Sequence, residues 1–81
     1  MKLIKLRFVY HRKNNIFCLQ RMTWYGRWKY IYYTVNLGYG SISNIYSDKS
    51  KKALLNGVLE HYYKTTKQFV NIKEYPTIKL Y

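Results

Sequence analysis

The chain has 81 residues, with 15 Lys and Arg against 3 Asp and Glu, and a formal net charge of +12. This length predicts one small domain over residues 1–81 and excludes a catalytic domain beside a separate binding domain. So large an excess of cations favours a negatively charged partner: nucleic acid, a nucleoprotein or, alternatively, an acidic protein surface.

Cysteine content and hydropathy predict the compartment. The single Cys, Cys18, excludes an internal disulfide and indicates a reducing environment. The segment 1–13 is basic but lacks the apolar run of a signal peptide. No window approaches the roughly 20 apolar residues that a membrane span needs. We therefore expect a cytoplasmic protein with no membrane partner.

The first two predicted strands cover residues 2–10 and 16–24. In the first, Lys5 and Arg7 alternate with a row of apolar side chains, namely Ile4, Leu6, Phe8 and Tyr10. In the second, one face carries Phe17, Leu19 and Arg21, and the other carries Ile16, Cys18, Met22 and Trp24. The polar segment 11–15 predicts a turn, because Asn14 and Asn15 tolerate a left-handed backbone.

A third strand is predicted over residues 28–37, after a hairpin loop at 25–27 in which Gly26 takes a positive φ. One row of this strand is expected to face a helix: Ile31, Tyr33, Val35 and Leu37. The other row would then face outward: Trp28, Tyr30 and Tyr32. Residues 38–44 predict a flexible connection, and Ile42 and Ile45 allow a short fourth strand.

The segment 46–68 predicts a helix with Ser47 as its N-cap and Asp48 in its first turn. Its apolar stripe follows two adjacent rows, Leu54, Val58 and Tyr62 beside Leu55, Leu59 and Tyr63. Gly57 interrupts the helix, for which either a close approach of the backbone to the sheet or sequence drift would account.

The tail 69–81 predicts one or two short strands bent at Pro76. The expected fold class is therefore α+β: a small two-layer domain with an antiparallel β-meander of three to four strands. One helix packs on one face of the meander, and a short C-terminal strand follows.

One helix covers one face of such a sheet, so the other face is available to a partner. Aromatic rings interleaved with cations suit nucleic acid, because bases stack on rings while Lys and Arg hold phosphates. They also suit a protein interface. An alternative is structural, with Trp24 and Trp28 clamping the hairpin across Gly26. The candidate binding residues are Lys5, Arg7, Arg12, Lys13, Arg21, Arg27, Trp28, Lys29, Tyr30, Tyr32, Lys49, Lys51 and Lys52.

Other chemistry has little support in the sequence. His11 and His61 have no Cys or carboxylate at metal-ligand spacing, and Cys18 alternates with apolar neighbours as a buried thiol does. Three acids do not supply a paired-carboxylate site. The segment 47–52 combines Ser and Lys at a predicted helix start, which fits either a phosphate site or an ordinary capped turn. We expect no catalytic residue, metal, cofactor or small-molecule substrate.

The order strand-strand-strand-helix resembles, in topology alone, the arm-binding domain of phage-type tyrosine recombinases, which present a three-stranded sheet to the DNA major groove. No motif is shared, so no residue role is carried over. RNA recognition motifs also place rings on a sheet, but their element order and signature differ from this chain.

The sequence therefore predicts a non-enzymatic basic protein that binds nucleic acid, RNA in preference to DNA, or a nucleoprotein. The alternative is a phage or mobile-element inhibitor of a nucleic-acid-handling enzyme, such as an anti-CRISPR-like inhibitor of an RNA-guided nuclease. A further alternative is a structural protein of a ribosome or virion.

Overall fold

The first two predicted strands form the centre of the sheet. β1 (Leu3–His11) and β2 (Ile16–Met22) pair antiparallel, with Phe8 opposite Leu19. The turn between them places Asn15 at a φ of 54°, as the polar segment predicts. The computed structural model describes residues 3–81, so the predicted start of the first strand at residue 2 lies outside the described residues.

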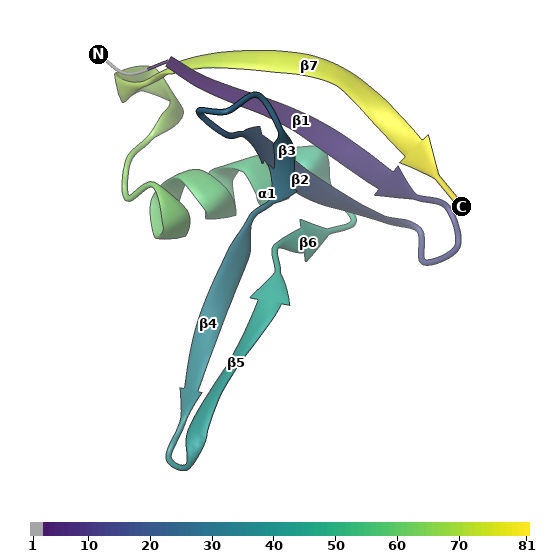
Figure 1. Cartoon of the computed structure of the whole chain (residues 1–81). Coiled ribbons are helices and arrows are strands. Elements are labelled where there is room, and N and C mark those ends of the chain that lie inside the picture. The colour runs from purple at the N-terminus through teal and green to yellow at the C-terminus, as the bar shows by residue number, and fades with distance from the viewer. Residues whose placement is uncertain (1–2) are drawn as a thin grey trace.

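The sheet is mixed, because the C-terminal strand is parallel to β1 (Figure 1). β3 (Trp28–Tyr30) and β6 (Ser47–Asp48) both pair antiparallel with β2, and β7 (Asn71–Leu80) pairs with β1. The resulting order is β3-β2-β1-β7. The α+β fold with one helix is confirmed, whereas the C-terminal strand is longer than expected.

Pro76 lies at an irregularity within β7. The register with β1 shifts between Arg7, which is opposite Tyr75, and Val9, which is opposite Ile78. Proline has no N–H to donate to a ladder, and a bulge is a position at which a strand tolerates it. The tail is therefore one strand with a bulge at the predicted bend.

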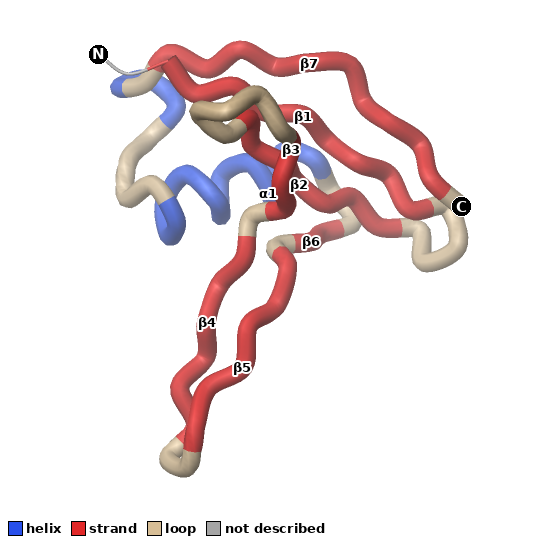
Figure 2. The backbone as a smooth tube through the Cα atoms, viewed as in Figure 1, coloured by secondary structure: helices blue, strands red, loops and turns tan. Residues whose placement is uncertain are grey.

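The predicted third strand is divided at Ile31. β4 (Tyr32–Leu37) leaves the sheet and pairs only with β5 (Gly40–Ile45), so the two form a separate hairpin, residues 32–45, which we call the arm (Figures 1 and 2). Ile31 itself is 1% exposed, and its N–H donates to the Leu19 carbonyl at 3.1 Å. The expected fourth strand exists, but in the arm.

The expectation that Tyr33, Val35 and Leu37 face the helix is wrong. Of that row, Ile31 alone enters the core. The Tyr46 N–H donates to the Ile31 carbonyl at 3.0 Å, and this bond joins the two ends of the arm next to the body. The chain beyond Ile31 extends away from the sheet, as Figure 2 shows.

The helical segment begins later than predicted. α1 (Lys51–Gly57) continues into a π-helical turn, η1 (Val58–Tyr62), and a 3₁₀ turn, η2 (Lys67–Phe69), precedes β7. The N-cap is Ser50, whose Oγ accepts the Ala53 N–H at 3.4 Å. Ser47 is not the cap, because it pairs with Cys18 in β6 and is held extended there.

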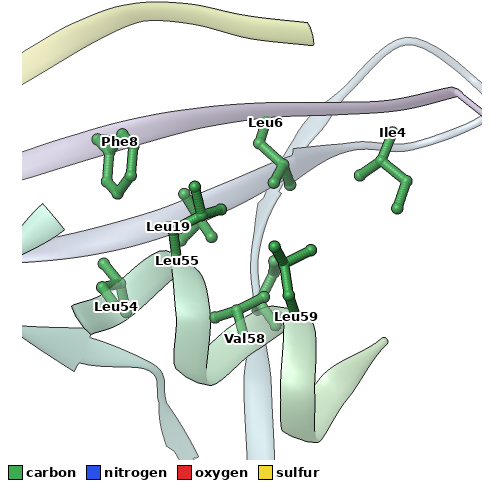
Figure 3. Close-up of a cluster of buried hydrophobic side chains, with 9 residues drawn as sticks. Ile4, Leu6, Phe8, Leu19, Leu54, Leu55, Val58 and Leu59 are labelled. Atoms are coloured by element: carbon green, nitrogen blue, oxygen red, sulfur yellow. The ribbon is translucent and has the colours of Figure 1, made fainter. Parts of the chain in front are cut away.

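The predicted helical stripe is confirmed at its centre (Figure 3). Its buried members, Leu54, Leu55, Val58 and Leu59, pack on four residues of β1 and β2: Ile4, Leu6, Phe8 and Leu19. Tyr63 is partly buried at the end of this cluster, whereas Tyr62 is exposed. The sheet and helix thus form a body with one core, from which the arm projects.

Candidate nucleic-acid interface

The face of the sheet that points away from α1 is the candidate site, and we call it the open face. Side chains alternate along a strand, so Lys5 and Arg7 point away from the helix where Leu6 and Phe8 point toward it. Register extends the face across β2, β3 and β7. Its polar and aromatic members are Lys5, Arg7, His11, Gln20, Trp28, Tyr30, Lys73 and Tyr75.

Cations and rings alternate across the open face. The Arg7 guanidinium carbon lies 4.5 Å from the centre of the Trp28 ring, which lies 5.0 Å from the Tyr75 ring. The Lys73 ammonium lies 5.1 Å from the centre of the Tyr75 ring. These residues come from β1, β3 and β7 and so span the whole width of the sheet. Each cation–π contact adds about 0.5–1 kcal/mol where it is exposed to solvent.

Arg7 is held in position by Gln20. The Arg7 Nε–H donates to Gln20 Oε1 at 2.6 Å, and Gln20 is buried. A guanidinium has five N–H donors, so this bond fixes its plane and leaves donors available to a phosphate. Arg7 is therefore both oriented and able to bind an anion.

Tyr30 and His11 form a second aromatic pair on this face. Their ring centres are 6.2 Å apart, and the Tyr30 hydroxyl lies 3.5 Å from His11 Nε2. Burial raises the pKa of Tyr30, which keeps the hydroxyl protonated. Burial also raises the pKa of the Cys18 thiol in the adjacent strand, so Cys18 is a poor nucleophile at neutral pH.

The acidic residues all lie away from the open face. Glu74 is in register with Leu6 on the helix side and bonds to Lys67, with Oε1 and Nζ 3.3 Å apart. Asp48 precedes α1, where its Oδ1 accepts the Ser50 N–H at 2.9 Å, and Glu60 lies in η1. The chain has only these three acids. The open face therefore combines cations and rings without a carboxylate to repel phosphate.

The structure gathers some of the sequence-predicted residues and separates others. Lys5, Arg7, Trp28 and Tyr30 lie on the open face. At its margins, Arg12 and Lys13 lie in the β1–β2 turn and Arg27 in the β2–β3 loop. The residues that lie elsewhere are Arg21 and Lys29 on the helix side, Tyr32 in the arm, and Lys49, Lys51 and Lys52 at the start of α1.

The prediction that Arg21 and Tyr32 belong to the binding face of the sheet is thus wrong. Arg21 is in register with Leu6, so it points to the helix side, where it lines a hollow of about 320 Å³ with Tyr62 and Tyr63. Tyr32 pairs with Ile45 in the arm, because the predicted third strand leaves the sheet after Ile31.

Lys51 closes one edge of the core. Its ammonium lies 5.4 Å from the Phe8 ring and 5.3 Å from the Phe17 ring, and it donates to Thr77 Oγ1 at 2.9 Å. These contacts join α1 to β7, which favours the ordinary structural interpretation of the segment 47–52 over a phosphate site.

Sequence reasoning missed Lys73 and Tyr75. Their alternation with Ile72 and Glu74 is visible in the sequence and marks them as one face of a strand. The parallel pairing that brings Tyr75 opposite Arg7 is a long-range contact, and no local pattern encodes it.

The comparisons with known proteins add no relative: no protein-family model, curated protein or solved structure matches the chain. No helix in the described part of the chain combines the length and apolar character needed to cross a bilayer.

Proposed function

We propose that this protein is a non-enzymatic binder of single-stranded RNA and that the open face is its binding surface. The observation that carries the proposal is the alternation of Arg7, Trp28, Tyr75 and Lys73 on a face without acids. Single-stranded RNA offers unpaired bases to rings and phosphates to cations at the same time.

The division of roles follows from the geometry. Trp28, Tyr30 and Tyr75 provide ring surfaces for bases, because each is only partly buried. Lys5, Arg7 and Lys73 are the cations of the same face, and Lys5 and Lys73 are in register on adjacent strands. A face of rings and cations responds to base stacking and charge more than to base identity, so we expect weak sequence preference.

The test of charge uses two lysines of β7. With three phosphate contacts to a single strand, the slope of log affinity against log salt should be about −2. Lys73→Gln on the open face should weaken binding and reduce the slope by about 0.7. Lys79→Gln is the matched control, because Lys79 is in register with Tyr10 on the helix side. Fluorescence anisotropy with an RNA oligonucleotide measures both; equal losses in the two variants would reject the open face.

The test of stacking compares two aromatic residues that the sequence placed in one row. Trp28→Leu should lower RNA affinity by about 1–3 kcal/mol, the range for one base on one ring. Tyr32→Leu, in the arm, should leave it unchanged. Thermal melts of both variants separate lost binding from lost folding, because Trp28 also contacts Arg7 and Tyr75. A larger effect at Tyr32 would assign RNA binding to the arm.

A basic face without acids also suits a nucleoprotein. We propose, in addition, that the protein acts in the cytoplasm. Pull-down from a lysate with and without nuclease separates the targets. Capture that survives nuclease, together with no affinity for free RNA, would replace direct binding with inhibition of a nucleic-acid-handling enzyme. Co-purification with ribosomal or virion particles would favour a structural role in those assemblies.

A further inference from the structure

The arm differs in charge from the rest of the protein. From Tyr30 to Ser47 the chain has no Lys, Arg, His, Asp or Glu, although charged residues make up 22% of the whole. All of β4 and β5 is exposed or half-buried. This segment therefore presents a neutral surface to solvent in a protein with a net charge of +12.

The two faces of the arm are unlike. Register places Val35 opposite Ile42, and these residues continue an apolar row formed with Tyr33 and Leu37. Val35 is 39% exposed and Ile42 is 50% exposed. The opposite face has the apolar pair Tyr32 and Ile45 at the base of the arm, but beyond it is polar, with Thr34 opposite Ser43 and Asn36 opposite Ser41. Such alternation is typical of a sheet that is covered on one side and solvated on the other.

The body covers little of the apolar row. The base of the arm contacts the body through the Tyr33 ring, whose centre lies 5.0 Å from that of the Tyr46 ring. Beyond this contact, the arm extends into solvent (Figures 1 and 2). A lone two-stranded hairpin is marginally stable in water, and exposed edges are usually protected by charge or proline. This arm has neither. Its exposed row of apolar side chains is, in addition, suited to a covering partner.

We infer that the partner is a second copy of this chain, and that two arms pack apolar row against apolar row about a two-fold axis. The charges favour this occupant. Nucleic acid and acidic proteins are disfavoured, because the arm has no cation to pair with them. Two copies of charge +12 repel one another, and a neutral arm lets them touch without bringing like charges together.

The arm also suits a two-fold contact by its shape. It projects from the basic body, so arms that overlap keep the bodies apart. In an isologous contact the same patch faces itself, and a row of Tyr33, Val35, Leu37 and Ile42 is complementary to itself. One hairpin face is smaller than the ~800 Å² per partner of a standard interface, so the dimer should be weak and dependent on concentration.

Salt distinguishes this inference from the proposed function. Repulsion between the bodies is screened by salt, so dimerisation should strengthen as salt rises, whereas RNA binding should weaken. The inference stands on the arm alone, and either proposal can fail without the other.

Sedimentation velocity of the nucleic-acid-free protein over a concentration series tests the inference. We expect a monomer–dimer equilibrium that Val35→Lys shifts toward monomer by more than about 100-fold in Kd, because two apposed charges would be buried. Asn36→Lys is the matched control, since it adds the same charge at the next position on the polar face. A monomer at every concentration, or equal effects of the two variants, would overturn the inference.

A cysteine cross-linking variant tests the same contact without adding a charge. It keeps the test valid if Val35→Lys disturbs the structure of the arm itself. Under a mild thiol oxidant, Val35→Cys should form a disulfide-linked dimer and Asn36→Cys should not. Cys18 is buried and contributes little background. Equal cross-linking at both positions would indicate random collision and reject the two-fold contact.

Discussion

The body and the arm are both built from strands, yet only the body has a core. β2 pairs with β1 on one edge and with β3 and β6 on the other, and its central residues are buried. β4 pairs with β5 alone and has no fully buried residue. Alternating side chains therefore mark a strand, while burial depends on what the tertiary structure places beside it.

This contrast also separates the two proposals by their chemistry. The open face of the body gathers cations and rings from β1, β3 and β7, and it fits a polyanion. The arm gathers neutral and apolar side chains from β4 and β5, and it fits a neutral surface. Two surfaces of one small chain thus suit different partners: a charged one at the open face and a neutral one at the arm.

The largest expected difference between the regions is in unfolding free energy. Leu59 is 1% exposed and packs in the core, so Leu59→Ala should destabilise the protein by about 2–5 kcal/mol. Val35→Ala, in the arm, should change stability by less than about 0.5 kcal/mol. Chemical denaturation at low protein concentration measures both. Similar losses would show that arm and body unfold as one cooperative unit.

Much of the body could be predicted from local sequence patterns. The alternation of Lys5 and Arg7 with apolar neighbours defines two faces, and the rows through Leu55 and Leu59 define the buried side of the helix. Gly26, in the predicted hairpin loop, has a φ of 83°. Each of these features depends on residues close in sequence, which explains why the sequence alone identifies them.

The division at Ile31 could not be predicted in the same way. Residues 28–37 are rich in aromatic and β-branched side chains typical of strands, and no Gly or Pro marks the point where the strand leaves the sheet. The division depends on Ile31 bonding to Leu19 and Tyr46, which are 12 and 15 residues away in the chain. Tyr32 was misplaced for this reason, and Tyr75 was missed because its pairing with Arg7 spans most of the chain.

A smaller difference is expected between two glycines in turns. Gly26 joins β2 to β3 with a φ of 83°, and its N–H donates to the Thr23 carbonyl at 3.1 Å. Gly26→Ala should destabilise the body by about 1–2 kcal/mol, because a Cβ disfavours left-handed backbone. Gly38 at the tip of the arm has no such φ, and a Cβ there meets nothing within 4 Å. Gly38→Ala should therefore leave the melting temperature unchanged; a loss equal to that of Gly26→Ala would mean that the arm tip is as constrained as the body.

The smallest expected effect is a gain of stability at Gly57. Its φ of −61° and ψ of −44° are helical, and a Cβ at this position meets nothing within 4 Å. Close approach to the sheet therefore does not explain this glycine, and drift is the interpretation that remains. Gly57→Ala should stabilise the protein by about 0.5–1 kcal/mol, because alanine loses less backbone entropy than glycine on entering a helix. Since the helix covers the core of the body, the gain should appear in the global thermal melt. A decrease in melting temperature would instead show that the junction between α1 and the π-helical turn requires glycine at this position.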